Sequence, residues 1–465
     1  MSSQAYVTAD STKVFVRELD RAYPLIDHAE GVWLYDQAGT KILDAVGGGA
    51  MVCSLGHGVK EIIEAATRQA TRVSFLYNQQ FTTDVQEALA AELTEVAPDG
   101  FDRVHFVSGG AEANEMALRL ARSYHAERGE TGRVAIISPA QAYHGPTWAT
   151  LALTGRPGLQ APHQPYLPPL LHIPPSTWRF DATGEAALAQ LDRAIAEAGP
   201  GGVSAFFCEP VSAAALPAYT PPNRFWEGLE ERRQIHGFLV CFDEVVTGVG
   251  RTGSWFAADW IPIVPDIITT AKGLGAGYAP VGAVICRQEI YNAFEQGSRA
   301  FELGHTWDGA PLPSAVGRAV LAYIKKHGLI DHVAKQGPIL KQALSDALAD
   351  HEIVREVRGH GFLLGIEYVD PRDGESFLAP ELGVARRIDI AALENQLIVY
   401  STQPTGDGYV GDQTLLAPAF VSSQDELDQI VERTAATVDQ IESEVKSELA
   451  GETVAAASPS QQTPE

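Results

Sequence analysis

Short apolar runs alternate with helical patterns through the middle of this chain, and this alternation constrains the fold more than any other feature. Each run is rich in β-branched or aromatic residues and lacks a polar face, as expected of strands buried on both sides of a sheet. The runs are VHFV at 104, VAIIS at 134, VSAFFC at 203, FLVCF at 238, DIITT at 266 and VGAVIC at 281. Helical patterns at 111–126 and 223–236 fit the crossovers between parallel strands. We therefore predict an α/β fold with a mostly parallel central sheet.

The chain after residue 310 has a different pattern, which predicts a second, smaller α+β domain. Its apolar spacing indicates helices near 313–327, 332–350 and 424–448, with the strand-like FLLGIEYV before the last of them. We expect the N-terminal segment, which contains the hairpin-like VWLYDQAGTKILDAV, to pack with this domain. The predicted division is residues 1–60 for that segment, 61–309 for the large domain, 310–450 for the small domain and 451–465 for a disordered tail.

Composition excludes several classes of partner. The 465 residues carry a formal net charge of −25, which argues against nucleic acid because phosphate backbones are bound by basic surfaces. No apolar stretch is long enough to span a membrane, and the N-terminus lacks the pattern of a secretory signal, so we expect a cytoplasmic protein. The cysteines form neither a CxxC metal site nor a disulfide framework, so we predict no metal site and expect core roles for Cys53, Cys208, Cys241 and Cys286.

The candidate functional residues follow three of the apolar runs, where parallel sheets collect their ligands. After VHFV, the segment SGGAEAN at 108–114 leads into a helix, whose first N–H groups can bind an anion such as phosphate. Asp243 follows FLVCF at the edge of the sheet, and Lys272 follows DIITT among small residues that let an aldehyde approach. Taken singly, each feature has a commoner explanation: a glycine turn, a helix cap or ion-pair partner, and a surface lysine.

Together, the three features match the needs of one cofactor. Pyridoxal 5′-phosphate (PLP) requires an anion site for its phosphate, a buried carboxylate that keeps its ring nitrogen protonated, and a lysine that attacks its aldehyde. The segment 108–114, Asp243 and Lys272 would supply these groups. The sequence therefore predicts an enzyme that holds PLP on Lys272.

The motifs DEVVTGVGRTG at 243 and TTAKGLGAGYAPVGA at 269 resemble those of the class III (omega) aminotransferases, which are PLP-dependent enzymes of fold type I. The resemblance implies that Lys272 is the Schiff-base lysine and proton shuttle, and that Asp243 is the partner of the ring nitrogen. The implied ping-pong reaction moves an amino group from an amine or amino acid to an oxo acid. PLP-dependent decarboxylases, aminomutases and racemases share the fold and remain alternatives, as does a non-catalytic relative that binds PLP.

Other motifs imply further cofactor contacts. Tyr143 and His144 belong to AYHG, which resembles the family's SYHG turn, whose tyrosine stacks on the cofactor ring. Val245 is expected to pack on the opposite face of the ring. Gly110 and Ala111 match the phosphate-binding pair, although the family usually has Ser or Thr in place of Ala111. One hydroxyl donor is therefore lost, while the backbone donors remain.

Two further motifs imply a supporting acid and a partner subunit. Glu209, in EPV, is expected to give a supporting hydrogen bond near the phenolic side of the cofactor, and a buried structural acid is the alternative. Thr306, in GHTWDG, resembles the threonine that reaches the phosphate of the neighbouring subunit. The resemblance therefore implies a homodimer with shared active sites.

Two departures from the family concern the substrate. Relatives that use 2-oxoglutarate commonly carry a glutamate and an arginine that binds a carboxylate, whereas this chain has Ala214 and Leu415 at the counterpart positions. We therefore expect a pyruvate-like acceptor, with small-molecule amines and oxo acids as the partners. An arginine from another loop, such as Arg156 or Arg179, is the alternative source of positive charge.

Two more positions bear on the substrate pocket. Asp412, in GDQTLLAPAF, strengthens the likeness to the amine transaminases of this family. Met51 falls where that branch often has a tryptophan lining the pocket, so we expect a roomier pocket, although methionine also commonly fills protein cores.

Overall fold

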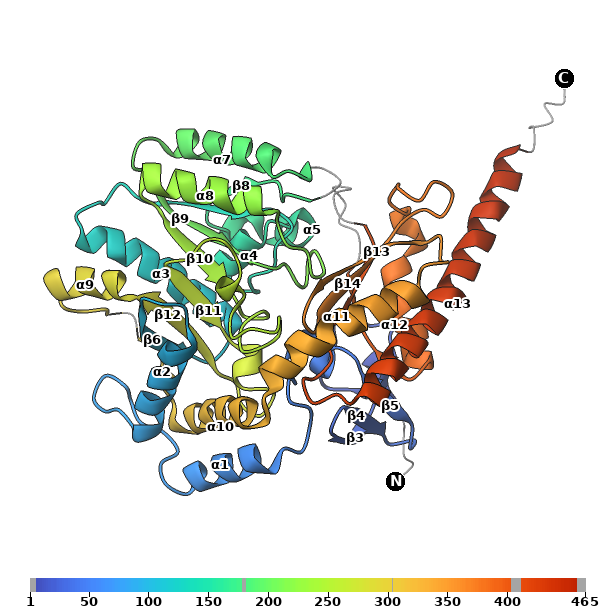
Figure 1. Cartoon of the computed structure of the whole chain (residues 1–465), viewed down its shortest axis with the longest axis horizontal. Helices are drawn as coiled ribbons and strands as arrows, with labels where there is room; N and C mark the ends of the chain where they lie inside the picture. Colours follow the sequence, from blue (N-terminus) through green and yellow to red (C-terminus); the bar gives the residue numbers. More distant parts are fainter. Residues whose placement is uncertain (1–5, 178–180, 303, 403–410, 458–465) are drawn as a thin grey trace.

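The computed structural model describes residues 6–177, 181–302, 304–402 and 411–457. Its larger part is built on one seven-stranded sheet (Figure 1). In spatial order the strands are β6 (Phe101–Val107), β12 (Gly282–Arg287), β11 (Ile267–Thr270), β10 (Leu239–Asp243), β9 (Val203–Cys208), β7 (Ala135–Pro139) and β8 (Leu171–Ile173). Neighbouring strands run parallel except at β12, which is antiparallel to both its neighbours. The predicted α/β fold with a mostly parallel sheet is confirmed.

Both faces of this sheet are buried, which explains why the apolar runs lack a polar side. In β9, Ala205 and Phe207 belong to one apolar cluster, while Phe206 and Cys208 belong to another on the opposite face. All six predicted runs form strands of the sheet. The short edge strand β8 was not predicted, because three residues are too few to show a period of two.

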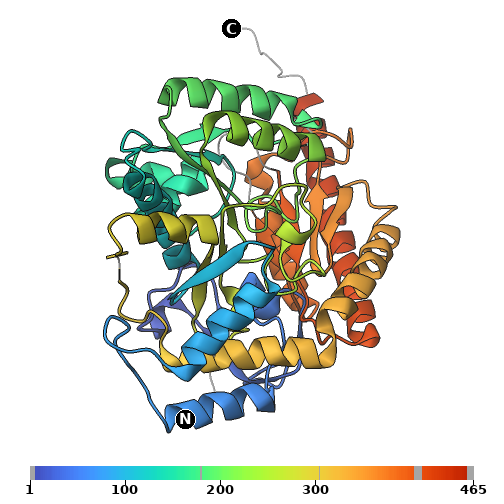
Figure 2. The same ribbon diagram turned by 60° about the vertical axis from the view of Figure 1, so that its left-hand side comes forward.

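Helices cover both faces, as the crossover patterns predicted. On one face lie α3 (Gly110–Glu127), α4 (Trp148–Thr154) and α9 (Gln288–Gln296), whose apolar residues join one cluster with the sheet. On the other face lie α7 (Glu185–Ala198) and α8 (Asn223–His236), which pack side by side (Figure 2). The short helix α5 (Pro157–Gln160) follows α4.

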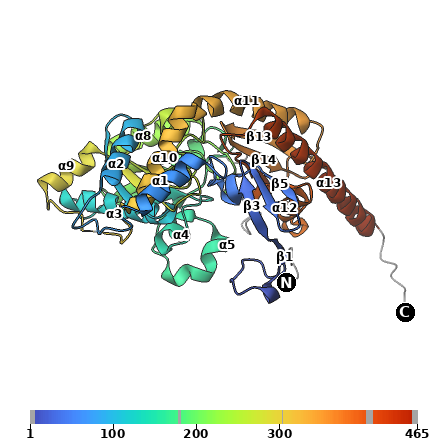
Figure 3. The ribbon, with the colours of Figure 1, turned by 90° about the horizontal axis from the view of Figure 1, so that it is seen from below.

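A smaller α+β part lies beside the larger one, as predicted (Figure 3). Its antiparallel sheet contains, in order, β13 (Val354–His360), β14 (Leu363–Tyr368), β17 (Gln413–Leu416) and β16 (Tyr400–Thr402). The helices α11 (Leu329–Ala347) and α12 (Val384–Glu394) pack against it, and α13 (Gln424–Ala457) packs against both of these helices. Helix α13 runs past Gly451, so helical backbone reaches into the segment predicted to be a disordered tail; residues 458–465 lie outside the described residues.

The N-terminal segment joins this smaller part through a second sheet. The strands β3 (Ile26–Glu30), β4 (Trp33–Asp36) and β5 (Lys41–Asp44) are antiparallel, and β15 (Leu397–Ile398) pairs in parallel with β5. The indole N–H of Trp33 also donates to Glu426 of α13 at 2.8 Å. The strands β1 (Tyr6–Val7) and β2 (Tyr23–Pro24) form a separate antiparallel pair. The N-terminal segment therefore shares a sheet with the smaller part through the pairing of β5 with β15.

Helix α10 (Pro311–His327) connects the two parts and packs against α1 (Lys60–Ala70) and α2 (Asp84–Val96). Arg318 of α10 contacts Glu92 of α2 at 2.7 Å. The first helix after residue 310 thus lies against the larger part, and the domain boundary at that residue stays a prediction. All four cysteines are free, and three of them are buried. In the described part of the chain, no helix has the length and apolar character needed to cross a bilayer.

Candidate active site

The carboxyl ends of the central strands border a cavity of about 290 Å³. Its lining comes mainly from the residues after β7, β9, β10 and β11 and from the start of α3. The structure brings eight of the nine predicted site residues to this cavity: Gly110, Ala111, Tyr143, His144, Glu209, Asp243, Val245 and Lys272. The ninth, Thr306, is exposed on a turn that does not line it. The sequence prediction therefore selected residues that share one site, and their roles stay predictions.

Lys272 lies in a sharp turn just after β11. Its φ of +35° falls in the left-handed region, and the residue begins a 3₁₀ turn, η5 (Lys272–Leu274). Although the residue is partly exposed to the cavity, burial of the amine lowers its pKa to about 8, against the opposing effect of nearby Asp243 and Glu209. A larger fraction of this amine is uncharged at neutral pH than of an ordinary lysine, and only the uncharged form attacks a carbonyl carbon. Lys272 thus has the chemistry required of a nucleophile.

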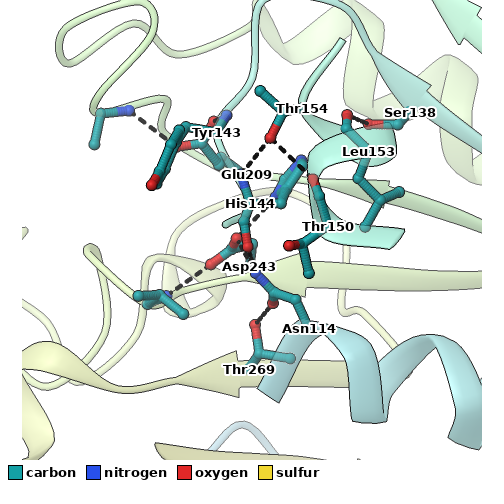
Figure 4. A network of polar contacts seen from close by, with 12 residues as sticks. Asn114, Ser138, Tyr143, His144, Thr150, Leu153, Thr154, Glu209, Asp243 and Thr269 are labelled. Atoms are coloured by element: carbon teal, nitrogen blue, oxygen red, sulfur yellow. Dashed lines mark hydrogen bonds and ion pairs between the residues drawn. The ribbon is translucent and has the colours of Figure 1, made fainter. Parts of the chain in front are cut away.

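Asp243 is the last residue of β10, and hydrogen-bond donors surround its buried carboxylate (Figure 4). Its Oδ2 accepts a hydrogen bond from Asn114 Nδ2 at 2.7 Å and lies 2.8 Å from His144 Nδ1. Its Oδ1 accepts the backbone N–H of Val245 at 3.0 Å. Contacts on both oxygens hold the carboxylate in one orientation. Asp243 can therefore offer a negative charge to a cationic group in the cavity.

Two residues of this network, Asn114 and Thr269, received no role from the sequence. The Thr269 hydroxyl donates to Asn114 Oδ1 at 2.6 Å, and the Asn114 amide also donates to the carbonyl oxygen of His144 at 2.8 Å. Helical spacing could have found Asn114, since it lies one turn after Gly110 on the same face of α3. Strand register could have found Thr269, because it is the direct neighbour of Asp243 in the sheet.

The start of α3 borders the cavity and could hold an anion. The first N–H groups of the helix have no acceptor within it. A Cβ atom on Gly110 would lie 2.8 Å from Cγ1 of Val245, so only glycine lets Val245 approach this closely. The buried hydroxyl of Ser108 has no hydrogen-bond partner among the described residues and lines the same cavity. Ser108 can therefore supply the hydroxyl donor that Ala111 lacks.

Glu209 follows β9 and holds the turn that carries Tyr143. Its carboxylate accepts the backbone N–H groups of Tyr143 and Ala213, both at 3.1 Å. Burial raises the pKa of Glu209 to about 7, and the nearby charge of Asp243 adds to this effect. The ring of Tyr143 is 37% exposed and borders the cavity. Glu209 therefore anchors the backbone of the turn. This position fits both a supporting hydrogen bond near the cofactor and the role of a buried structural acid.

The residues expected to select the substrate divide between the cavity and the core. Ala214 lines the cavity, whereas Leu415 and Met51 are buried in one apolar cluster beside it. The expectation that Met51 lines the pocket is therefore not met. Its buried position agrees instead with the alternative that this methionine fills the core. Arg156, just before α5, is not among the lining residues, and Arg179 lies outside the described residues. Among the described residues that line the cavity there is no arginine.

Asp412 has a structural position. Its Oδ1 accepts the backbone N–H of Ala385 at 2.7 Å, at the start of α12, and the side chain is buried. A carboxylate at the first turn of a helix stabilises the helix dipole. The side-chain hydrogen bond of Asp412 is thus to α12, and Asp412 is not among the residues that line the cavity.

The α/β fold, with this cavity at the carboxyl ends of its strands, is that of the PLP-dependent transferases of fold type I. Residues 15–438 match the model of the family described as aminotransferase class-III. The chain is 33% identical to the putrescine–pyruvate aminotransferase of Pseudomonas aeruginosa, over 90% of each chain. It is also 33% identical to the diaminobutyrate–2-oxoglutarate transaminase of Halomonas elongata, again over 90% of each. The chain therefore belongs to the class III aminotransferases, a PLP-dependent family.

The fold of solved omega-transaminases agrees with this assignment. The omega-transaminase of Pseudomonas jessenii, determined in complex with PMP, has a TM-score of 0.85 and 28% sequence identity to this chain. The match covers 91% of this chain and 94% of that one. The predicted resemblance and fold class are thereby confirmed.

Proposed function

We propose that this aminotransferase binds PLP in the cavity at the carboxyl ends of β9, β10 and β11, with Lys272 as its covalent attachment point. The observation that carries the proposal is the convergence of three groups on one cavity: the amine of Lys272, the carboxylate of Asp243 and the first turn of α3. The purified protein incubated with PLP should develop an absorbance band that disappears when an amine is added. A protein that never acquires such a band would contradict the proposal.

Each group would have a separate task. Bound PLP supplies an electron-accepting ring that stabilises negative charge on the substrate carbon. Lys272 would hold the cofactor and then carry a proton, while Asp243 would keep the ring nitrogen protonated. The first turn of α3 and the Ser108 hydroxyl would bind the phosphate, and Tyr143 and Val245 would enclose the ring. These assignments use only residues that border the cavity.

We further propose that the oxo-acid acceptor is pyruvate or another monocarboxylate. A second carboxylate in the cavity would need a cationic partner, because an unpaired buried charge is strongly unfavourable. Lys272 is the one lysine, and there is no arginine, among the described residues that line the cavity. Sequence similarity does not choose between acceptors, since relatives named for pyruvate and for 2-oxoglutarate are equally identical to this chain.

The acceptor prediction is tested by comparing two oxo acids with one amine donor. We expect kcat/KM to be at least about tenfold higher for pyruvate than for 2-oxoglutarate, which corresponds to about 1.4 kcal/mol in the transition state. A tenfold preference for 2-oxoglutarate would refute it. Release of CO₂, or racemisation without consumption of the oxo acid, would instead favour the decarboxylase or racemase alternative.

We also propose a homodimer in which Thr306 completes the active site of the partner subunit. Phe75 and Trp307 are exposed and meet edge to face, with ring centroids 5.4 Å apart. A second cavity of about 400 Å³, lined in part by Trp307, shares Ser108 with the active-site cavity. A partner subunit covering these exposed aromatic rings would therefore reach the proposed phosphate site.

Subunit dissociation and loss of PLP are expected to occur together. The substitution Trp307→Glu places a charge in the proposed interface and should yield monomers that bind PLP at least about tenfold more weakly. Ile235→Glu is the matched control, because Ile235 is 74% exposed on α8 and should leave both properties unchanged. Analytical ultracentrifugation with PLP titration provides the measurement. An active, PLP-saturated monomer contradicts the proposal. The cytoplasmic location likewise stays a prediction.

A further inference from the structure

The hydrogen bonds around Asp243 allow one orientation of the Asn114 side chain. The amide nitrogen faces two acceptors, Asp243 Oδ2 at 2.7 Å and the carbonyl oxygen of His144 at 2.8 Å (Figure 4). The amide oxygen faces the hydroxyl of Thr269 at 2.6 Å. If the amide were reversed, its oxygen would face two other oxygens that have no hydrogen to donate. Thr269 must therefore be the donor in its bond to Asn114.

The same reasoning determines the hydrogen on His144. Its Nδ1 lies 2.8 Å from Asp243 Oδ2, and a carboxylate oxygen can only accept, so Nδ1 carries the hydrogen. Its Nε2 is buried with no partner among the described residues, and the ring stands edge-on to Phe207. His144 is therefore a hydrogen-bond donor to Asp243 through Nδ1.

These assignments make the two oxygens of Asp243 unequal. Oδ2 accepts two side-chain hydrogen bonds, from Asn114 and His144, and both of these residues are buried. Oδ1 accepts the backbone N–H of Val245, its one hydrogen bond in the described part of the chain, and a carboxylate oxygen has room for a second. Oδ2 is the anchored oxygen, and Oδ1 is the one with remaining capacity.

We infer that Asn114 and Thr269 are positioning residues, which anchor Asp243 through Oδ2 and so reserve Oδ1 for the ring nitrogen of the cofactor. This inference rests on the proposed binding of PLP in the cavity. Thr269 acts through Asn114: its hydroxyl fixes the amide, and the amide fixes the carboxylate. The chain Thr269–Asn114–Asp243 joins β11, α3 and β10, so the carboxylate is held by three separate elements.

The strand β11 offers a matched pair of substitutions that test this inference. Thr269→Val removes the hydroxyl while keeping the shape of a buried, β-branched side chain. Thr270→Val makes the same change at the next residue, whose buried hydroxyl has no hydrogen-bond partner within the described residues. Thr269→Ser restores the hydroxyl without the methyl group. Thermal unfolding of each variant reports on stability separately from cofactor binding.

Loss of the Thr269 hydroxyl should leave Asn114 Oδ1 unpaired and Asp243 less firmly held. For Thr269→Val we expect PLP to dissociate about tenfold more readily and kcat to fall about tenfold, with the KM for the amine within threefold of wild type. The pH at which the absorbance of the bound cofactor changes should also shift. Thr269→Ser and Thr270→Val should remain within about twofold of wild type in affinity and rate.

Several results would overturn the inference. One is a Thr269→Val variant that matches wild type in affinity, rate and absorbance. Another is an equal loss of PLP affinity and kcat in Thr269→Val and Thr270→Val, since valine would then disturb the strand regardless of which hydroxyl is removed. A third is a Thr269→Ser variant that loses as much PLP affinity and kcat as Thr269→Val. Failure of the wild-type protein to bind PLP would instead contradict the proposed function, so the two failures are distinguishable.

Discussion

The Lys272→Ala variant should lose transamination almost completely, with kcat reduced on the order of a millionfold, as when other enzymes lose their covalent nucleophile. No second lysine lines the cavity among the described residues, so no neighbouring amine can replace it. Borohydride treatment of the PLP-loaded wild-type protein should fix the cofactor to the peptide that contains Lys272. Mass spectrometry of the digested protein and steady-state kinetics provide the measurements.

The matched control for this variant is Lys325→Ala. Lys325 lies on α10, where it pairs with Glu95 of α2 at 3.3 Å, and it does not line the cavity. Surface ion pairs of this kind contribute little to stability, so the control should retain wild-type kinetics. Full turnover by Lys272→Ala, or attachment of the cofactor to another lysine, would remove Lys272 from its proposed role.

Asp243→Asn should lower kcat by at least about a thousandfold, equivalent to about 4 kcal/mol in the transition state. The amide oxygen can take the position of Oδ2 and accept from Asn114 and His144, but its NH₂ group then meets the N–H of Val245, which is also a donor. A neutral amide also cannot keep a ring nitrogen protonated. Kinetics together with the absorbance spectrum of the bound cofactor test this expectation.

The neighbouring acid provides the control. Glu244 is also buried, and its carboxylate accepts the N–H groups of Ala257 and Ala258 at 2.6 and 2.9 Å. Burial raises its pKa to about 7, so a substantial fraction of this carboxyl group is already uncharged at neutral pH. Glu244→Gln should therefore reduce thermal stability more than it reduces kcat. A wild-type rate in Asp243→Asn would show that the cofactor binds elsewhere.

Sequence alone could bring residues to the cavity where they lie next to the end of a strand, although their roles stay predictions. Asp243 and Lys272 directly follow apolar runs, and their position at the cavity depends only on the strands being parallel and adjacent. Asn114 and Thr269 carry weaker signals, a helical spacing and a strand register that many other residues share. An asparagine in a helix and a threonine in a strand are common, and their importance arises only from contacts with residues far along the chain.

The predictions about substrate residues were less secure for a related reason. Aligning motifs identified Ala214 and Leu415 as counterparts, but it could not distinguish a cavity-lining side chain from one in the adjoining apolar cluster. One residue's difference in a strand reverses the side of the sheet to which a side chain points. The role proposed for Thr306 requires a second subunit, which no pattern within one chain can position.

The pairing of β5 with β15 has a consequence for how this protein is made. Residues 41–44 leave the ribosome long before their sheet partner at 397–398, because most of the chain described here lies between them. At typical elongation rates the interval is on the order of tens of seconds, which is far longer than a sheet needs to form. The strands of the large sheet can assemble during that interval, because they all lie between the two partners in the chain. The strands β3, β4 and β5 therefore keep an unpaired edge during that interval, and their sheet is completed only after the strands of the large sheet have been synthesised.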